Sequence, residues 1–121
     1  AIGFALPSLA QQKDLEKKTR VLATEYDAAV NKRDASAIAA LYTDDGIWST
    51  FNEGAFQGRQ AIANEYQTLY FKHWKIHNYV TTVRQVTAAG RVVRSTGTWS
   101  CVSSEGGGRN VNGNYSWVLV D

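Results

Sequence analysis

Two adjacent carboxylates, Asp44 and Asp45, are the first candidates for chemistry in this chain of 121 residues. A pair of acidic groups can supply the general acid and the general base of an enzyme. These two residues, followed by Gly46, come where a helical pattern of apolar residues ends and an alternating pattern begins. Asp and Gly are also typical turn residues, because Asp bonds to nearby backbone and Gly tolerates positive φ. We therefore interpret the pair as a turn.

Two histidines and one cysteine are the other obvious reactive side chains. His73 and His77 are four residues apart, but the segment around them is typical of a strand. Four strand residues span about 13 Å, at roughly 3.3 Å each, so this pair cannot chelate one ion unaided. Cys101 is alone in the strand-like segment TWSCVS, where a small buried hydrophobe is the expected role. We predict no metal site.

A glycine-rich stretch, Gly106 to Arg109, resembles a phosphate cradle in composition only. It lacks the lysine and threonine of a P-loop, and a strand follows it where a P-loop has a helix. We interpret the stretch as a hairpin loop and expect no cofactor.

The composition is that of one soluble globular domain, with 44% hydrophobic and 20% charged residues. The 13 basic and 11 acidic residues give a net charge of +2, and the basic residues are spread along the chain. This distribution argues against nucleic acid as a partner, since phosphate binding needs a concentrated positive surface. Four tryptophans, six tyrosines and four phenylalanines either fill a core or wall a pocket.

The first twelve residues, AIGFALPSLAQQ, form an apolar run that closes on small residues. They match the end of a secretory signal peptide cleaved after Ala10, or else an N-terminal arm that packs Phe4 and Leu6 on the domain. No other segment approaches the roughly 20 apolar residues that span a membrane. We expect a periplasmic or secreted protein without a membrane partner.

The first half of the chain has helical periodicity. One helix is expected from about Asp14 to Arg33, a second over residues 34–42 with Asp34 as its cap, and a third from about Arg59 to Phe71. The predicted buried positions are Leu15, Leu22, Tyr26, Ala29, Val30, Ile38, Leu41, Tyr42, Ile62, Tyr66, Leu69 and Tyr70.

The second half has strand periodicity. Gly54 and Gly58 bracket an expected loop, and Asn112-Gly113 is expected to belong to the last turn. Helices followed by an antiparallel meander predict one α+β domain over residues 13–121, in which a curved sheet wraps a helix and leaves a cone-shaped space. The expected strands are residues 47–51, 73–87, 91–104 and 111–120.

Three segments together carry a family resemblance: EYDAAVNKRDASAIAALYTDDGIW, FQGRQAIANEY and GNYSWVLVD. Their order and spacing resemble the SnoaL-like and ketosteroid-isomerase-like members of the nuclear transport factor 2-like superfamily, from Leu15 to Asp121. The resemblance implies a cone-shaped α+β barrel with N-terminal helices packed on a strongly bent antiparallel sheet. It also implies a pocket and homodimers that pack through the sheet, and it is greatest for short exported bacterial members.

The resemblance allows the catalytic positions to be compared one by one. The tyrosine that donates to an enolate oxygen in ketosteroid isomerases corresponds to Tyr26. The aspartate that acts as their general base corresponds to Thr50, and a hydroxyl cannot take a proton from carbon near neutral pH. Their second oxyanion donor corresponds to Ser116 where the family pattern has an aspartate. Steroid isomerase chemistry is therefore not expected.

What remains is a predicted ligand pocket. Alternation along the first strand places Trp48 and Thr50 on the same face. The resemblance implies that Thr50 faces the cavity, and Trp48 then does too. With Tyr26 of the first helix and Ser116 of the last strand, this makes an aromatic cavity with hydroxyl donors, which suits a small and mostly apolar molecule. For Tyr26, a purely structural role in the core is an equal alternative. For Trp74 and Trp99, contact with a dimer partner or packing on a helix is the alternative to a place in the pocket wall. The predicted ligand-binding residues are Tyr26, Trp48, Thr50, Trp74, Trp99 and Ser116.

Two functions remain open at this stage. One is the binding, and perhaps transformation, of a small hydrophobic molecule in the cone. The other is a noncatalytic module that self-associates through its sheet as a homodimer or higher homo-oligomer. Family members usually continue past YSWVLV into a final strand, which is missing from the sequence up to Asp121. An uncovered last strand would offer an edge for another chain.

Overall fold

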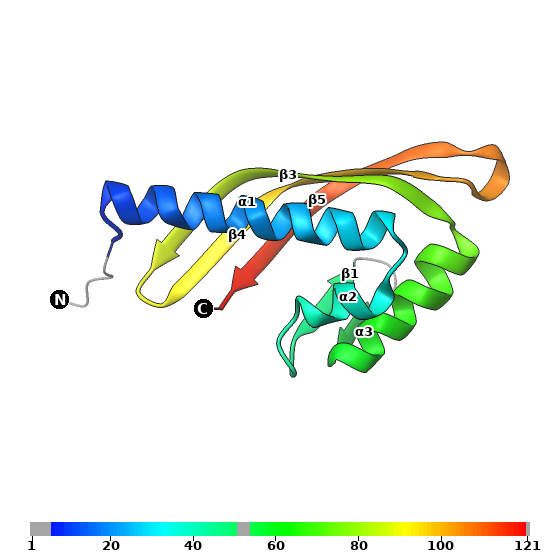
Figure 1. Ribbon diagram of the computed structural model, residues 1–121, viewed down its shortest axis with the longest axis horizontal. Coiled ribbons are helices and arrows are strands. Elements are labelled where there is room, and N and C mark those ends of the chain that lie inside the picture. The colour runs from blue at the N-terminus through cyan, green and yellow to red at the C-terminus, as the bar shows by residue number, and fades with distance from the viewer. Residues whose placement is uncertain (1–5, 51–53, 121) are drawn as a thin grey trace.

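The computed structural model describes residues 6–50 and 54–120, whose elements form two layers (Figure 1). One layer is a long three-stranded antiparallel sheet with helix α1 lying along it, and the other holds the shorter helices and a small hairpin. In chain order the elements are α1 (Leu9–Asn31), α2 (Ala35–Ala40), β1 (Ile47–Thr50), β2 (Gly54–Gln57), α3 (Arg59–Glu65), the π-helical η1 (Tyr66–His73), β3 (Ile76–Ala89), β4 (Val92–Ser103), the 3-10 turn η2 (Glu105–Gly107) and β5 (Arg109–Leu119).

Helix α1 begins earlier than its apolar periodicity predicts. Ser8 accepts a hydrogen bond from the amide of Gln11 at 3.1 Å, and the Gln11 side chain accepts one from the amide of Ser8 at 2.8 Å. This capping box starts the helix at Leu9 and not near Asp14. Of the segment interpreted as a signal remnant or arm, residues 1–5, with Phe4, lie outside the described residues, and residues 9–12 form the first turn of α1.

The second layer starts with two confirmed predictions and one correction. Asp34 caps α2 by accepting a hydrogen bond from the amide of Ala37 at 3.0 Å. Strand β1 lies where alternation predicts it. The expected loop after Gly54 is wrong, because residues 54–57 form strand β2, antiparallel to β1. A four-residue strand with glycine and alanine has little strand propensity of its own, so pairing with β1 determines its conformation.

Helix α3 continues into η1, whose wider π-helical turns change which side chains face inward. Tyr66 and Phe71, five residues apart, are both buried, whereas Leu69 is only half-buried. The segment ends at His73, so the predicted start of the next strand there is wrong. Strand β3 begins at Ile76 instead, after a left-handed residue at Lys75 with φ of 52°.

Strands β3, β4 and β5 pair in sequence order and antiparallel. Register irregularities between His77 and Val80 and between Val83 and Gln85 interrupt the β3–β4 ladder, and such bulges bend a sheet. The last turn is at residues 105–107, and the expected turn at Asn112-Gly113 is wrong because both residues lie inside β5. The buried core between the layers consists of Tyr26, Ala29, Val30, Ile38, Ile62, Tyr66, Phe71, Ile76 and Cys101, which confirms Cys101 as a buried side chain.

Side chains of α1 occupy the outer edge of β3 in place of a neighbouring strand. Asn31 donates from Nδ2 to the carbonyl of Tyr79 at 3.0 Å and accepts from the amide of Tyr79 at 2.7 Å. One turn earlier, the Asp27 carboxylate accepts hydrogen bonds from the amide of Thr81 at 2.8 Å and from its hydroxyl at 2.6 Å. We call these two residues the edge clasp. They satisfy backbone groups that an edge strand otherwise leaves open.

The same contacts fix the direction of α1, which runs antiparallel to β3. Near the start of the helix, Gln12 donates from Nε2 to the carbonyl of Val86 at 2.8 Å. Near its end, Asn31 holds Tyr79. The first turns of α1 therefore lie beside the β3–β4 turn, at the left-hand end of Figure 1.

The opposite edge of the sheet is different. Within the described residues, β5 pairs with β4 alone, and the β1–β2 hairpin forms a separate sheet. The predicted α+β fold, with N-terminal helices packed on a bent antiparallel sheet, is confirmed, and its sheet is not closed. None of the described helices has the length and apolar character to cross a membrane.

The edge clasp leads to a stability prediction. Asn31→Ala should lower the free energy of unfolding by about 1 kcal/mol, because the amide and carbonyl of Tyr79 lose two exposed hydrogen bonds and turn to water instead. Urea denaturation would measure the change, with the exposed neighbour Lys32→Ala as control. Equal effects of the two substitutions would contradict the role of the clasp.

Candidate functional site

The centre of the candidate site is a hydrogen bond between the hydroxyls of two buried tyrosines, Tyr26 of α1 and Tyr66 of η1. Their exposed fractions are 6% and 4%. The ring of Tyr26 also packs against Tyr79 of β3 and Trp117 of β5, with ring centres 5.9 and 5.8 Å away. Tyr26 therefore lies where α1, η1 and the long sheet meet.

The hydroxyl pair has hydrogen-bonding capacity left over. Two phenols carry two hydrogens, and their mutual bond uses one, so the second is available to an acceptor oxygen. Burial, followed by the neighbouring Tyr79 and Tyr70, raises the pKa of Tyr66 well above its ordinary value. Burial also raises the pKa of Tyr79. These groups stay neutral donors near pH 7, which suits them to hold a carbonyl or oxyanion.

Trp48 of β1 packs against Tyr66 on the side of the small hairpin. Its ring centre is 5.3 Å from Tyr66, 5.4 Å from Tyr70 and 5.6 Å from Phe56. Tyr70 in turn meets Trp74 edge-on at 5.2 Å. This continuous aromatic wall joins the predicted residues Trp48 and Trp74 to the hydroxyl pair.

On the sheet, two aromatic rings lie opposite glycines of the neighbouring strand. Trp99 stacks on Tyr79 at 6.0 Å and is paired in register with Gly113, where an added Cβ would lie 2.7 Å from the indole. Tyr115 is likewise paired with Gly97, where an added Cβ would lie 2.6 Å from the phenol ring. The glycines let the rings lie close against the sheet.

The predicted residues Thr50 and Ser116 are placed differently from each other. Thr50 lies with Trp48 on the less exposed face of β1, as alternation predicts. Ser116 lies on the exposed face of β5, and its neighbour Trp117 is the residue that contacts Tyr26. Side chains alternate along a strand, so a shift of one residue exchanges the two faces.

Tyr26, Trp48, Trp74 and Trp99 are thus connected through tyrosines, and Ser116 is not among them. The site residues that sequence reasoning missed are Tyr79, Tyr115 and Trp117, and Tyr66 was expected only to be buried. Alternation marks the faces of the strands, but their placement against Tyr26 depends on register, which no local signal provides.

Asp27 is the carboxylate next to Tyr26 in the chain. Burial raises the pKa of its carboxyl, and the two hydrogen bonds from Thr81 lower it in part. Both carboxylate oxygens are engaged by Thr81. The geometry therefore gives Asp27 a role in docking α1 on β3 rather than in proton transfer.

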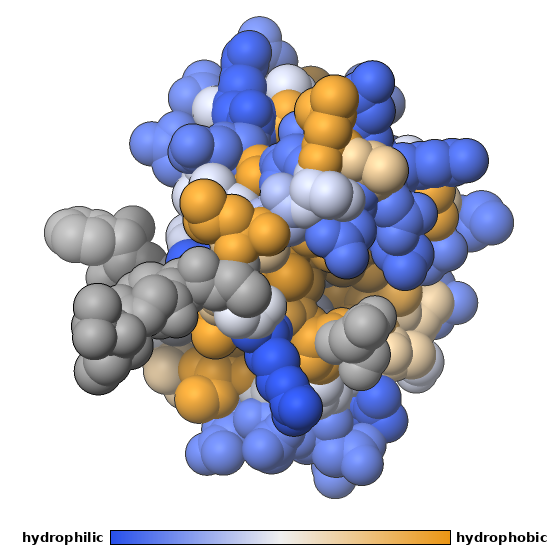
Figure 2. All heavy atoms as spheres, turned by 90° about the vertical axis from the view of Figure 1, so that its left-hand side faces the viewer, coloured by the Kyte–Doolittle hydropathy of each residue, from blue (hydrophilic) through white to orange (hydrophobic). Residues whose placement is uncertain are grey.

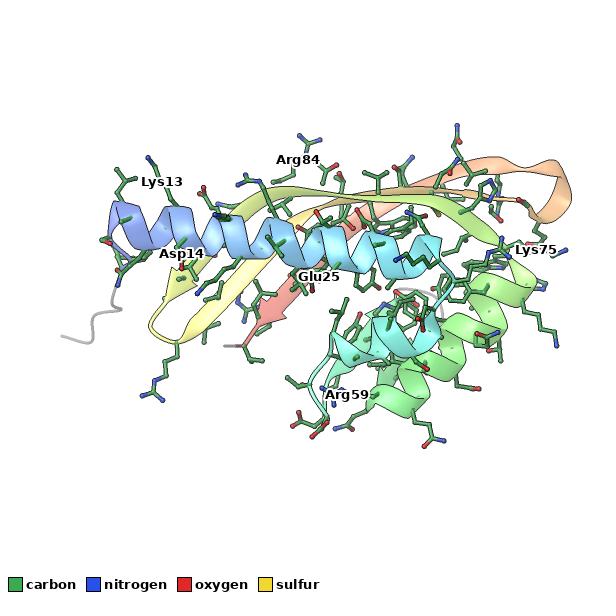
Figure 3. All side chains as sticks on the ribbon, viewed as in Figure 1. Lys13, Asp14, Glu25, Arg59, Lys75 and Arg84 are labelled. Carbon is green, nitrogen blue, oxygen red and sulfur yellow. The ribbon has the colours of Figure 1, made fainter. Side chains whose placement is uncertain are left out.

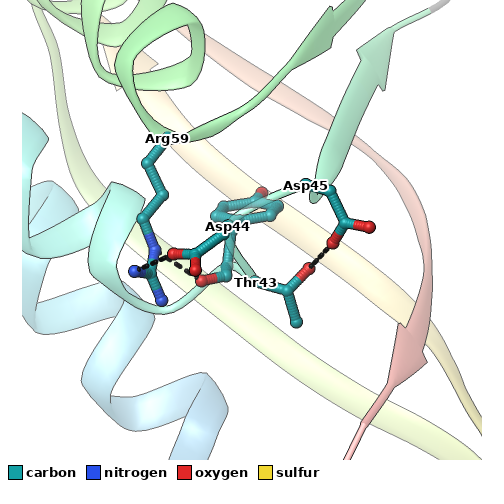
Figure 4. Close-up of polar contacts among 5 residues, drawn as sticks. Thr43, Asp44, Asp45 and Arg59 are labelled. Atoms are coloured by element: carbon teal, nitrogen blue, oxygen red, sulfur yellow. Dashed lines mark hydrogen bonds and ion pairs between the residues drawn. The ribbon is translucent and has the colours of Figure 1, made fainter.

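The aspartate pair forms an exposed turn, as predicted (Figure 4). Asp44 forms a 2.6 Å ion pair with Arg59, whose Nε also donates to the carbonyl of Tyr42 at 2.9 Å. Asp45 accepts a hydrogen bond from the hydroxyl of Thr43 at 3.2 Å. These contacts fix the turn before β1 to the start of α3.

His73 is the last residue of η1, and His77 lies near the start of β3. His73 is 3.4 Å from Glu105, and Nδ1 of His77 lies 3.3 Å from the hydroxyl of Ser104. Within residues 6–50 and 54–120, no group of three or more His, Cys, Asp or Glu side chains is arranged so that it could hold a metal ion.

Two surface hollows lie away from the aromatic site. One, of about 730 Å³, is lined by α2, Gln57 and α3, and the other, of about 390 Å³, is on the outer face of α1. None of the predicted ligand-binding residues lines either hollow. The aromatic side chains pack against one another at the site itself.

A family model described as a SnoaL-like domain matches residues 23–120 of this sequence. The chain belongs to the SnoaL-like family. The matched region includes every residue of the hydroxyl pair and of the aromatic wall, and the family resemblance inferred from the sequence is confirmed. Among curated proteins, none matches the chain.

Solved structures agree with this SnoaL-like fold. A protein of unknown function from Mycobacterium tuberculosis has a TM-score of 0.80 at 18% identity, covering 94% of this chain and 67% of its own. A ketosteroid isomerase-like protein from Erwinia carotovora atroseptica has a TM-score of 0.70 at 17% identity, covering 93% and 85%. The hexachlorocyclohexane dehydrochlorinase LinA-type3 from Novosphingobium barchaimii has a TM-score of 0.65 at 17% identity, covering 86% and 77%. At such identities the similarity shows the fold alone.

The glycine and aromatic pairs of the SnoaL-like sheet lead to a second prediction. Gly97→Ala should destabilise the protein by about 1–3 kcal/mol or more, because its Cβ would lie 2.0 Å from the carbonyl oxygen of Thr82 as well as against Tyr115. The exposed Ser100→Ala on the same strand is the control. Denaturation midpoints that agree for the two variants would contradict the packing described.

Proposed function

We propose that the protein binds a small, mostly apolar molecule that carries one acceptor oxygen. The observation that supports this most directly is the buried Tyr26–Tyr66 hydroxyl pair, which has one hydrogen left to donate within an aromatic cluster. An apolar surrounding strengthens such a bond, because water does not compete for the donor. The ligand oxygen would accept from the pair, and its body would contact the rings of Trp48, Tyr79 and Trp117.

Access to the pair requires movement of a side chain, because both tyrosines are buried. Trp48 is the candidate gate. It is half-buried and belongs to a two-stranded hairpin of four-residue strands that is separate from the main sheet. Rotation of this indole away from Tyr66 would open a path for the ligand from the side of β1.

The proposal is one of binding, with no reaction assigned. The hydroxyl pair would stabilise negative charge on an oxygen, as the oxyanion donors of acyl and enol chemistry do. A proton-abstracting group is lacking at Thr50, and Asp27 is engaged by Thr81. The solved structures with this fold include a hexachlorocyclohexane dehydrochlorinase and a ketosteroid isomerase-like protein.

Thermal-shift screening with small aromatic ketones and steroids tests the binding proposal. A ligand present at about 100 times its Kd should stabilise the native protein by about 2.7 kcal/mol. Tyr26→Phe should weaken binding because the pair loses a donor, and Trp48→Ala should weaken it by loss of ring contact.

Tyr42→Phe is a matched control for Tyr26→Phe, because it removes a half-buried phenol hydroxyl outside the hydroxyl pair and the aromatic wall, and it should retain the shift. If no compound stabilises the wild type, or if Tyr26→Phe binds every hit equally well, the proposal fails.

A second candidate function, self-association through the sheet, is favoured by the outer face of β3, β4 and β5. In the middle of that face one row of cross-strand neighbours is uncharged and consists of Thr82, Thr98 and Asn114. The exposed Val80 lies in the adjacent row with Ser100. Burying an uncharged surface of this kind against a second copy costs little desolvation free energy.

Sedimentation velocity tests this second function. If the outer face forms a homodimer, Val80→Glu combined with Thr98→Glu should shift the protein to monomer, because buried carboxylates would face each other across the symmetry axis. Thr24→Glu on the exposed side of α1 should leave the dimer intact. A wild-type protein that sediments as a monomer at all concentrations would exclude this function.

A further inference from the structure

One end of the molecule gathers basic residues that are dispersed in the sequence. Residues 6–24 and 83–96 together contain seven basic and two acidic residues, although the whole chain has 13 and 11. The remaining residues therefore hold six basic and nine acidic ones. The seven are Lys13, Lys17, Lys18, Arg20, Arg84, Arg91 and Arg94, and we call the surface that carries them the basic end.

The antiparallel docking of α1 on β3 creates the basic end. Gln12 binds the carbonyl of Val86, so the first four turns of α1 lie beside the last part of β3 and the turn to β4. Figure 3 shows Lys13 of α1 and Arg84 of β3 extending from the same side of the molecule. Two segments about 70 residues apart in the chain thus share one surface.

Most of this charge is not compensated locally. Lys18 forms an ion pair with Asp14 at 3.2 Å. The other six basic side chains are exposed, and none is in an ion pair within the described part of the chain. The basic end therefore exposes a net positive charge to solvent.

Apolar side chains are concentrated at the same end. Eight large hydrophobic residues are exposed in the described chain, and six of them lie here, with exposed fractions between 47% and 81%. Val118 belongs to this end because it pairs in register with Arg94. Figure 2 views the molecule from this side and shows hydrophobic atoms in its middle with hydrophilic side chains around them. The six residues are Leu6, Leu9, Val21, Val92, Val118 and Val120.

The combination of exposed basic and exposed apolar side chains distinguishes between possible partners of the basic end. A nucleic acid or an acidic protein surface offers negative charge but few sites for exposed leucine and valine side chains. The surface of an anionic bilayer accepts both, since cations lie at the phosphates while apolar side chains enter the boundary between head groups and acyl chains. We propose that the basic end docks the protein on an anionic lipid bilayer.

This docking is peripheral and involves no membrane-spanning segment. It departs from the expectation of no membrane partner, which rested on the length of apolar segment needed to span a bilayer. The proposal does not depend on a ligand at the tyrosine pair, since it uses a different set of side chains.

Co-sedimentation with vesicles tests the proposal. The protein should bind to phosphatidylcholine vesicles that contain one quarter phosphatidylglycerol, and it should bind much less to vesicles of pure phosphatidylcholine. Binding to the charged vesicles should weaken as the salt concentration rises. The double substitution Arg84→Gln and Arg91→Gln should weaken binding about fivefold for each charge removed. Val92→Ser should also weaken it. The control is Lys72→Gln with Arg109→Gln, which removes two exposed charges outside the basic end and should retain most binding.

Three outcomes would overturn docking on lipid. One is equal sedimentation with charged and neutral vesicles. Another is an equal loss of binding in the two double variants. The third is binding of soluble polyglutamate without binding of vesicles, which would assign an acidic polypeptide to this surface instead.

Discussion

The contact between α1 and the open edge of β3 is the constraint on which the rest of the structure depends. Asn31 and Asp27 bind the strand backbone as another strand would, so they fix both the position of the helix and its rotation about its own axis. That rotation directs the neighbouring Tyr26 inward to Tyr66. A helix held only by apolar contacts could slide or turn, and Tyr26 would then lose its partner. The polar edge of the sheet therefore determines the geometry of the apolar interior.

The sequence predicts the helices, the order of the strands and most of the core, because these follow from periodicity and caps within a few residues. The helix cap at Asp34 and the turn at Asp44 are predicted correctly for this reason. Features that depend on partners distant in the chain cannot be predicted from the local sequence. Strand β2 exists through its pairing with β1, and Gly113 remains in a strand because Trp99 covers it. The π-helical turns of η1 moved Phe71 into the core in a way that a 3.6-residue period does not anticipate.

The candidate site likewise has residues that the sequence predicts and residues that it does not. Tyr26 is predicted because the family resemblance implies a donor tyrosine at that position, and Trp48 because alternation places it on the same face of its strand as Thr50. The family resemblance points to Ser116, but its neighbour Trp117 occupies the inner face, so an offset of one residue separates the predicted residue from the one that contacts Tyr26. The aromatic interior has two uses that compete. Close packing of the rings stabilises the fold, whereas a bound ligand requires some of that packing to be given up, so its affinity is reduced by the free energy of opening.

The uneven distribution of charge has a consequence beyond contact. With a basic excess at one end and an acidic excess over the rest, the molecule has a permanent electric dipole. Such a dipole exerts a torque on the protein near any charged surface, so that it turns before it collides, provided that the separation is within about 10 Å at an ionic strength of 0.1 M. A folded chain with a net charge of only +2 therefore approaches charged objects in a preferred orientation.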